Sequence, residues 1–236
     1  MTQPQTAVVT GATEGIGRAI AFALASAGYR VGVCARSAQN VSALVADLRA
    51  SGAEASGRSA DVANPDEVGA LVQQVQDDLG PVDVLVNNAG IMRIRPFAEL
   101  TLEDWDATMA TNVRGLFIMT RAVLPGMRQR RRGAIVNIAS LAGKNGFVGG
   151  AAYTASKHAV LGFAKSLMLE VRKDDIRVIS ICPGSVDTRL LQKEPTMYGK
   201  DRKIMAPEDV ADVVLAALAL PARALVSELD LRPTNP

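Results

Sequence analysis

Short apolar runs alternate with longer amphipathic stretches along the whole chain. The runs are rich in Val, Ile and Ala at successive positions, which is typical of strands that a parallel sheet buries on both faces. The predicted strands are 6–10, 30–35, 53–59, 82–86, 134–140, 176–182 and 224–231. Because strands alternate with helical patterns throughout, the sequence predicts an α/β fold. We expect a mainly parallel sheet with right-handed crossovers and helices on both faces.

The predicted helices have recognisable boundaries. Gly28 ends the first, and Asn64 followed by Pro65 and Glu67 is a strong helix start. The helices are expected at 18–27 and 39–50, after Asn64, at 101–127, from Tyr153 and from Pro207. The polar segment 189–205 precedes the last helix, and we interpret it as a substrate lid. At 236 residues the chain fits a single domain, 1–236, better than two.

Composition and charge narrow the function classes. Hydrophobic residues make up 48% of the chain and aromatic residues 4%, which suits helices packed on a sheet of small aliphatic residues. The 26 Lys and Arg against 24 Asp and Glu give a formal net charge of +2, which argues against a nucleic-acid binder. We expect no leader and no membrane segment, since 1–5 is short and polar and no apolar run is long enough. Cys34 and Cys182 are too few for a disulfide framework, so we expect a cytoplasmic protein.

One basic run stands out, because Arg128, Arg130, Arg131 and Arg132 closely precede Gly133. The run follows a helical pattern, and cations are favourable at a helix C-terminus while glycine ends helices. We favour this structural interpretation over a binding site for a polyanion.

A glycine-rich turn joins the first strand to the first helix. Gly11, Gly15 and Gly17 occupy it. In this context the backbone N–H groups and the positive end of the helix can receive a pyrophosphate. Gly11 would permit the tight turn, Gly15 the close approach of a ligand, and Gly17 the packing of helix against strand. The turn therefore predicts a dinucleotide site.

The end of the second strand bears on which dinucleotide binds. An acidic residue there would hydrogen-bond the free ribose hydroxyls of NAD, but this chain has Arg36 and Ser37. A guanidinium favours the 2′-phosphate of NADP, and Ser37 can add a hydroxyl donor. The alternative is an ordinary solvent-facing arginine, and the charge of Glu14 in the glycine turn slightly opposes a phosphate. We predict that NADP(H) is preferred over NAD(H).

Polar residues also follow the third and fourth strands. Asp61 is either a partner for the amino group of an adenine or an ordinary loop carboxylate. The Asn-Asn-Ala-Gly segment 87–90 forms either a compact turn or a surface against which a ribose or nicotinamide lies. Asn112 is unfavourable inside a helix unless its side chain is occupied, and a water held near Lys157 would explain it.

Ser140, Tyr153 and Lys157 form the candidate catalytic group. Ser140 ends a strand, and Tyr153 and Lys157 lie four positions apart, on one face of a helix. A free tyrosine has a pKa of about 10, so it is a poor proton-transfer group at neutral pH unless a nearby cation lowers that pKa. We expect Lys157 to do so, while Ser140 holds a carbonyl oxygen that receives the tyrosine proton. Alone, the Tyr-x-x-x-Lys spacing is a common accident on helices.

The motifs above recur in one known order. They are Thr10-Gly11-x-x-x-Gly15-Ile16-Gly17, Asp61, Asn87-Asn88-Ala89-Gly90, Asn112, Ser140, Tyr153-x-x-x-Lys157 and Pro183-Gly184. In order and spacing they resemble the short-chain dehydrogenase/reductase family over essentially the whole chain. The resemblance implies a single doubly wound Rossmann-type domain with a seven-stranded sheet.

The resemblance also implies residue roles. Tyr153 would be the acid/base, Ser140 would orient and polarise the carbonyl, and Lys157 would lower the tyrosine pKa and hold the nicotinamide ribose. Asn112 would position a proton-relay water. Asp61 and Val62 would contact the adenine, and Val186 and Thr188 the nicotinamide amide. The remaining expected coenzyme contacts are Gly11, Thr13, Gly15, Ile16, Gly17, Arg36, Ser37, Asn88, Ala89, Gly90, Tyr153, Lys157, Pro183 and Gly184.

The resemblance further implies a homo-oligomer, a tetramer or dimer, built on the helices 101–127 and 153–171. One departure concerns the last strand, where 227–231 reads Ser-Glu-Leu-Asp-Leu and many relatives have Asp-Gly-Gly. It bears on the C-terminal contacts and on the oligomer that they help to build.

The function expected is reversible transfer of a hydride between nicotinamide and a carbonyl or secondary alcohol substrate, as in 3-oxoacyl or ketone reductases. A non-catalytic NADP(H)-sensing protein is the alternative. A sugar-nucleotide epimerase is disfavoured by the length of the chain. We expect the substrate to be a small molecule held by 92–97, 143–150 and the lid, with Phe147 as a wall. We expect no metal site, and His158, next to Lys157 on its helix, to be a packing or surface residue.

Overall fold

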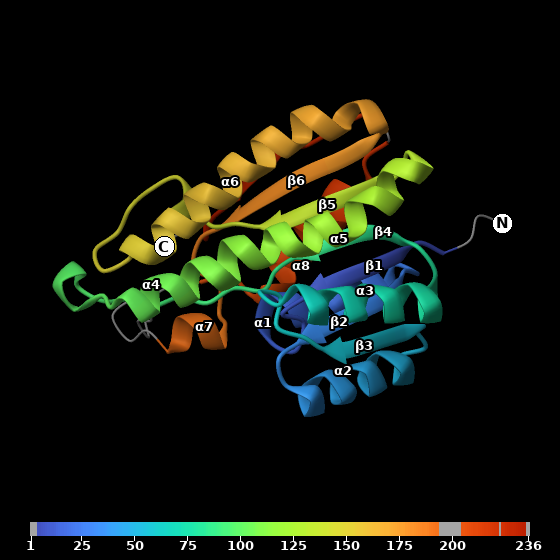
Figure 1. Cartoon of the computed structure of the whole chain (residues 1–236), viewed down its shortest axis with the longest axis horizontal. Coiled ribbons are helices and arrows are strands. Elements are labelled where there is room, and N and C mark those ends of the chain that lie inside the picture. Colours follow the sequence, from blue (N-terminus) through green and yellow to red (C-terminus); the bar gives the residue numbers. More distant parts are fainter. Residues whose placement is uncertain (1–3, 194–203, 222, 235–236) are drawn as a thin grey trace.

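The computed structural model describes residues 4–193, 204–221 and 223–234. Their strands form a seven-stranded sheet in the order β3-β2-β1-β4-β5-β6-β7, and each neighbouring pair is parallel (Figure 1). The strands are β1 Thr6–Thr10, β2 Arg30–Ala35, β3 Ala55–Ser59, β4 Val82–Asn87, β5 Gly133–Ile138, β6 Ile176–Pro183 and β7 Glu228–Leu231. The prediction of a doubly wound seven-stranded sheet is confirmed.

Helices cover both faces of the sheet because successive strand residues point to opposite sides. Ala7 and Val9 of β1 lie in one apolar cluster and Val8 lies in another. The first cluster includes residues of α1 Gly15–Ser26, α2 Ala38–Ala50 and α8 Pro207–Ala219. The second includes residues of α3 Pro65–Leu79, α5 Gly115–Arg130 and α6 Ala151–Val171. In the described ranges, every helix is too short or too polar to span a bilayer.

The helix predicted at 101–127 is interrupted. It consists of α4 Leu102–Met109, a π-helical segment η2 Ala110–Arg114 and α5, which ends at Arg130. Such π segments insert an extra residue into a helix and are frequent at functional sites. Here the segment places the Asn112 side chain in the protein interior, where it is 2% exposed.

The boundaries of β3, β4, β5, β6 and β7 differ from the prediction by one to four residues. The last strand begins at Glu228 rather than 224, because only the last four residues of β6, Ser180 to Pro183, pair with it. The fifth ends at Ile138, so Ser140 lies in the turn that follows β5. The apolar pattern could not locate these ends, because it continues beyond the paired residues.

The basic run is a helix end, as expected, but Gly133 does not terminate it. Arg131, with a φ of +49°, adopts the left-handed conformation that ends α5, and Gly133 opens β5. A Cβ at Gly133 would lie 2.6 Å from the sulfur of Met127, so close packing requires this glycine.

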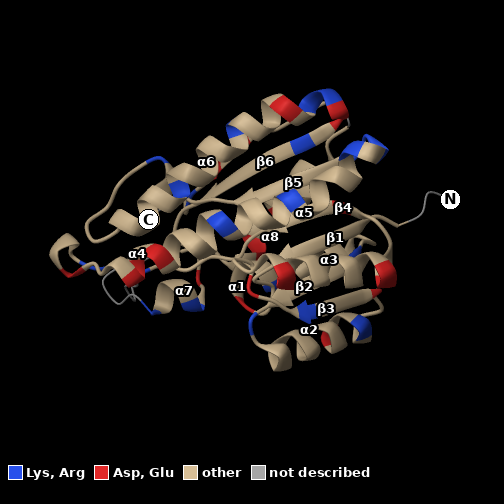
Figure 2. Cartoon of the chain, in the orientation of Figure 1, with Lys and Arg blue, Asp and Glu red and all other residues tan. Residues whose placement is uncertain are grey.

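Carboxylates neutralise much of this run. Arg128 pairs with Asp174 at 3.1 Å and Arg131 with Asp175 at 2.9 Å. Figure 2 shows the resulting mixture of basic and acidic segments where α5 and α6 end. The mixture favours the structural interpretation over a polyanion site.

Asp83 at the start of β4 is the buried member of this charge network. Its carboxylate accepts a hydrogen bond from the backbone N–H of Thr6 at 3.1 Å and lies 3.4 Å from Arg132 and 3.9 Å from Arg130. The side chain is 7% exposed. Asp83 therefore ties the first strand to the α5–β5 connection.

Replacing Asp83 with Ala should lower the free energy of unfolding by about 2–3 kcal/mol, because a buried N–H and two cations lose their partner. Urea unfolding measures the change. Asp47→Ala is the matched control, since Asp47 pairs with Arg18 at 3.0 Å on the surface and its removal should cost less than about 1 kcal/mol. Equal effects of the two substitutions would contradict this assignment.

Candidate active site

A groove runs along the edge at which the parallel strands end. It consists of a first cavity of about 320 Å³ and a second of about 340 Å³. Both are lined by Ile16, Asn88, Gly90, Thr188 and Leu190, so they are continuous. The groove lies where ligands bind in doubly wound sheets, at the carboxyl ends of β1 and β4, between which the strand order reverses.

Most of the residues predicted to bind the coenzyme line this groove. The first cavity is lined by Gly11, Thr13, Gly15, Ile16, Arg36, Ser37, Asp61, Val62, Asn88, Ala89, Gly90 and Thr188. The second is lined by Ser140, Tyr153, Lys157, Pro183, Gly184 and Val186. Gly17 and Asn112 are not among the lining residues of either cavity.

The glycine turn has the conformation that the sequence predicts. Gly11 and Gly15 have φ values of +60° and +52°, which favour glycine. Glu14 precedes α1, but its side chain makes no capping hydrogen bond. The first N–H groups of α1 therefore have no capping side chain and are available to an anion.

Gly17 acts through Asn88. The side-chain amide of Asn88 donates to the carbonyl oxygens of Thr10 at 2.9 Å and Gly11 at 3.0 Å. A Cβ at Gly17 would lie 2.4 Å from the amide nitrogen of Asn88. Gly17 thus makes room for the side chain that holds the glycine turn, which the sequence analysis did not foresee.

Two of the lining residues also have local structural partners. The Ser37 hydroxyl oxygen accepts from the N–H of Asn40 at 3.3 Å and caps α2. An Asp61 carboxylate oxygen accepts from the N–H of Ala63 at 2.9 Å. Both interpretations of Asp61 therefore stay open, since it shapes its loop and also faces the groove.

Glu14 has a partner that the sequence gave no means of finding. Its carboxylate lies 3.5 Å from the guanidinium of Arg189, and both residues line the first cavity. Arg189 opens the short helix α7 Arg189–Gln192. The ion pair partly neutralises the negative charge in the glycine turn.

Tyr153 and Lys157 both project from α6 into the buried end of the groove. Tyr153 is 9% and Lys157 6% exposed. The Lys157 ammonium donates to the carbonyl oxygen of Ile138 at 2.8 Å and lies 5.7 Å from the centre of the Tyr153 ring. The edge of Phe147 packs against the same ring, with centroids 6.4 Å apart. Phe147 thus forms the wall that the sequence analysis expected.

The pKa of Tyr153 is shifted in the direction opposite to that predicted from the sequence. Burial raises the pKa of Tyr153 above its ordinary value, and the Ser140 hydroxyl offsets this only in part. Burial lowers the pKa of Lys157 from 10.5 to about 8. The expected lowering of the tyrosine pKa by Lys157 is therefore not present in this structure. Desolvation is the largest cause of the raised pKa of Tyr153, and the ammonium of Lys157 is oriented toward the Ile138 carbonyl.

The side chain of Asn112 makes three hydrogen bonds within the protein. Its side-chain oxygen accepts from the N–H of Ile91 at 2.8 Å, and its amide donates to the Ile91 carbonyl and to the Ser156 hydroxyl, each at 2.9 Å. With Lys157 it lines a small separate cavity of about 10 Å³, about the space that one water needs. Neither the bond to Ile91 nor that to Ser156 has a signal in the sequence.

His158 is a surface residue, as the sequence analysis expected. Its side chain is exposed, and its Nδ1 lies 2.9 Å from the Thr154 carbonyl.

Cys182, Glu228 and Asp230 form a group of possible metal ligands, because one ligand atom of each lies within 4.8 Å of the others. The Lys144 ammonium is bonded to both carboxylates, so a cation of the chain already neutralises them.

A parallel doubly wound sheet, a glycine turn at its edge, and a buried tyrosine and lysine beside a serine define a dinucleotide-dependent oxidoreductase. The family model described as short chain dehydrogenase matches residues 5–199. The chain therefore belongs to the short-chain dehydrogenase family.

Individual relatives are similar over most of their length. A putative ketoacyl reductase of Streptomyces coelicolor is 48% identical over 186 residues, which are 78% of this chain and 71% of the relative. A 3-oxoacyl-[acyl-carrier-protein] reductase of Synechocystis is 39% identical over 234 residues, 94% of this chain and 92% of the relative. A crystal structure of a variant actinorhodin polyketide ketoreductase with NADPH has a TM-score of 0.91 and 40% identity, covering 98% of this chain and 96% of that one. These relatives favour an oxidoreductase over the non-catalytic sensing protein.

The low pKa of Lys157 can be measured directly. In the protein without coenzyme, NMR of ¹³C-labelled lysines should show one ammonium that titrates near pH 8, because burial penalises its charged form. This resonance should be absent from Lys157→Met. A midpoint at or above about 10, the ordinary value for lysine, would show that the ammonium is not desolvated.

Proposed function

We propose that this protein is an NADP(H)-dependent carbonyl reductase that also catalyses the reverse oxidation of a secondary alcohol. One observation carries the proposal: Ser140, Tyr153 and Lys157 lie in the same groove as the residues expected to bind the coenzyme. The names of the relatives, ketoacyl and 3-oxoacyl reductase, favour the same chemistry.

The groove fits an extended dinucleotide. At one end Arg36, an exposed guanidinium, would bind the 2′-phosphate of NADP. In the middle the glycine turn and the first turn of α1 would receive the pyrophosphate. Near the buried end Gly90 leaves open a space that a Cβ would enter, 3.3 Å from the Asn112 oxygen and 3.8 Å from the Lys157 ammonium. We assign this space to the nicotinamide end.

When bound, the reduced nicotinamide supplies a hydride, which no side chain of the chain can supply. Tyr153 then donates its proton to the oxygen of the substrate carbonyl. The raised pKa keeps the Tyr153 hydroxyl protonated at neutral pH, which suits the direction of reduction. The Ser140 hydroxyl holds the same carbonyl oxygen, and Lys157 stabilises the phenolate that forms and binds the nicotinamide ribose. Asn112 holds the adjoining segment through Ile91.

The second cavity favours an uncharged substrate. Among the described residues that line it, Lys157 alone carries a charge, and its ammonium is bonded to Ile138. Met92, Leu141, Phe147, Leu190 and Leu191 supply apolar walls. We therefore propose ketones, 3-oxo esters and 3-oxoacyl thioesters as substrates. Free oxo acids would bury a carboxylate without a partner.

This substrate class can be tested by comparing the rates of reduction of free 3-oxo acids and of their ethyl esters, and we expect the esters to react faster. A faster reaction with the free acids would contradict this substrate class.

We propose that 189–205 covers the substrate, as a lid. At the first end of the segment, Leu190 and Leu191 line the second cavity. At the second end, Ile204 packs against the wall of this cavity, and the backbone of Met205 is hydrogen-bonded to Ser185 and Asp187. Residues 194–203 lie outside the described part of the chain, so the proposal rests on the two ends of the segment.

We also propose a homo-oligomer, a tetramer or dimer, in which α5 and α6 pair with the same helices of a second copy. Between them lies a hollow of about 470 Å³, whose lining includes Phe117, Leu124 and Phe163 together with the charged Arg121 and Glu170. Apolar residues together with opposite charges suit a self-complementary two-fold contact. Analytical ultracentrifugation tests the oligomeric state, and a monomer at micromolar concentration would contradict this proposal.

We propose that the protein is located in the cytoplasm. Cys34 and Cys182 are free and buried, which is compatible with a reducing compartment.

Tyr153→Phe tests the catalytic assignment. Turnover of a 3-oxo ester should fall by about 10²–10⁴-fold, because the proton donor is lost, while NADPH binding should change little. Absorbance at 340 nm measures turnover, and fluorescence titration measures coenzyme binding.

Tyr29→Phe is the matched control for this experiment. Tyr29 is only partly buried and packs against the apolar cluster that includes α1. It should keep near-normal turnover. If Tyr153→Phe retained comparable turnover, the proposed mechanism would be wrong.

Arg36→Ser tests the coenzyme preference. The ratio of kcat/KM for NADPH to that for NADH should fall about 10- to 100-fold, because one or two charge-assisted bonds to the 2′-phosphate are lost. Arg58→Ser is the control, since Arg58 is an exposed arginine on the neighbouring β3 that does not line the groove. An unchanged ratio in Arg36→Ser would show that Arg36 does not select the coenzyme.

A further inference from the structure

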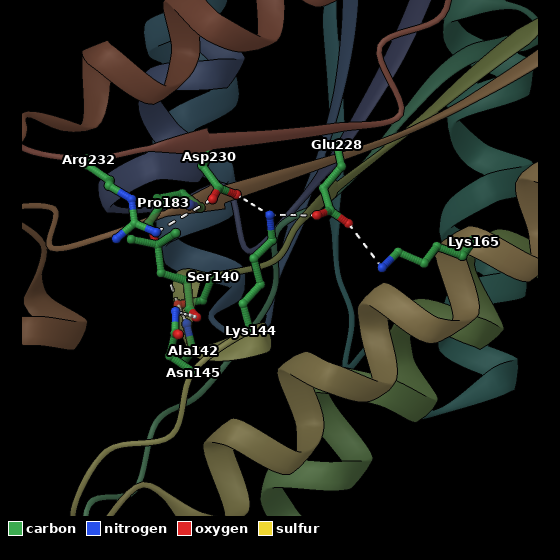
Figure 3. Close-up of polar contacts among 10 residues, drawn as sticks. Ser140, Ala142, Lys144, Asn145, Lys165, Pro183, Glu228, Asp230 and Arg232 are labelled. Carbon is green, nitrogen blue, oxygen red and sulfur yellow. Dashed lines mark hydrogen bonds and ion pairs between the residues drawn. The ribbon is translucent and has the colours of Figure 1, made fainter.

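Five side chains of alternating charge cross the last strand of the sheet (Figure 3). The Lys144 ammonium lies at the centre, bonded to the carboxylates of Glu228, at 2.5 Å, and Asp230. Lys165 lies 3.6 Å from the other oxygen of Glu228, and Arg232 lies 3.6 Å from that of Asp230. The charges thus connect the turn after β5, α6 and β7.

Lys144 is the member on which the arrangement depends. Glu228 and Asp230 are two positions apart on β7, so their side chains share one face of the strand. Their carboxylates lie close to each other and to the buried thiol of Cys182. Hydrogen bonds to both carboxylates raise the pKa of Lys144, so the ammonium stays charged at neutral pH. Without it, the two carboxylates would repel each other.

The backbone of Lys144 belongs to the same turn as Ser140. The 3₁₀ turn η3 Leu141–Gly143 follows Ser140 directly, and the N–H of Lys144 donates to Leu141 at 3.0 Å. The N–H of Gly143 donates to the Ser140 carbonyl at 2.8 Å. The Ser140 hydroxyl accepts from the N–H of Ala142 at 3.1 Å. Ser140 and Lys144 therefore belong to one short hydrogen-bonded turn, so a change in the position of Lys144 would also move Ser140.

The strand that holds Lys144 also holds the opposite wall of the groove. β7 pairs with the end of β6, and the N–H of Gly184 donates to the Leu231 carbonyl at 2.8 Å. The Ser140 hydroxyl reaches the carbonyl of Pro183 at 3.5 Å. Pro183 and Gly184 are among the residues that line the second cavity. β7 is thus the common support for the serine turn and for this wall.

We propose that Lys144 is a positioning residue for the reaction: by binding Glu228 and Asp230 on β7 it fixes the Ser140 turn against Pro183–Gly184, and so orients the Ser140 hydroxyl toward the substrate carbonyl. The proposal rests on the proposed function, because it concerns the carbonyl oxygen that Ser140 would hold. It explains why carboxylates occupy the last strand of this chain. It also assigns a role to a lysine that lies outside the catalytic group.

Lys144→Met tests the proposal in the full-length protein. The kcat for a 3-oxo ester should fall about tenfold, because Ser140 is no longer fixed, while the Kd for NADPH should change less than twofold. In a Ser140→Ala background the same substitution should have no further effect on kcat, because Lys144 acts through that hydroxyl. Lys144→Arg, which keeps the charge, should restore at least half of the loss.

Lys165→Met is the matched control, since it removes the outer cation from Glu228 without touching the Ser140 turn. It should leave kcat unchanged. If Lys144→Met does not fold, Glu228→Gln combined with Asp230→Asn removes both carboxylates and should give the same fall in kcat. An unchanged kcat in a folded variant, or losses that multiply with that of Ser140→Ala, would overturn the proposal. Failure of the proposed function itself would appear separately, as near-normal turnover in Tyr153→Phe.

Discussion

The parallel direction of the strands is the constraint on which the site depends. Because each neighbouring pair in the sheet is parallel, the strands end at one edge, and residues far apart in sequence meet there. The glycine turn follows β1, Gly90 follows β4, and Ser140 follows β5. The central strands β1 and β4 are buried on both faces by apolar packing, which holds the groove in place. A few hydrogen bonds also cross it, such as that from Asn88 to Thr10.

Burial gives the catalytic group its properties and also imposes a cost. A pKa of about 8 for Lys157, instead of 10.5, corresponds to about 3 kcal/mol of penalty on the charged form. One hydrogen bond, to the Ile138 carbonyl, offsets part of this penalty and fixes the direction of the side chain. The same burial raises the pKa of Tyr153. Desolvation therefore raises the pKa of Tyr153 and lowers the pKa of Lys157, and in both residues it favours the neutral form. An added negative charge nearby would favour the ammonium form of Lys157.

The sequence predicted the elements whose cause is local. Continuous apolar runs located β1 and β2 to the residue, because Gly28 and the glycine turn bound them. Most of the groove residues could be predicted because they follow a strand and parallel strands end together, whereas Tyr153 and Lys157 were predicted from their helical spacing. The direction in which the pKa values of Tyr153 and Lys157 shift could not be predicted, because the spacing of the two residues in the sequence does not indicate how deeply they are buried. The π segment at Asn112 and its bonds to Ile91 and Ser156 also depend on tertiary packing. Likewise, Lys144 meets Asp230 across 86 positions, and no periodicity reports such a contact.

The central claim is that Tyr153 and Ser140 act together on one carbonyl oxygen at the buried end of the groove. A crystal structure with NADP⁺ and an unreactive ketone analogue would test it most directly. The account predicts that the tyrosine and serine hydroxyls both lie within about 3 Å of the ketone oxygen, with Lys157 at the nicotinamide ribose. A ketone bound with its oxygen away from both hydroxyls, or a nicotinamide outside this groove, would contradict the account.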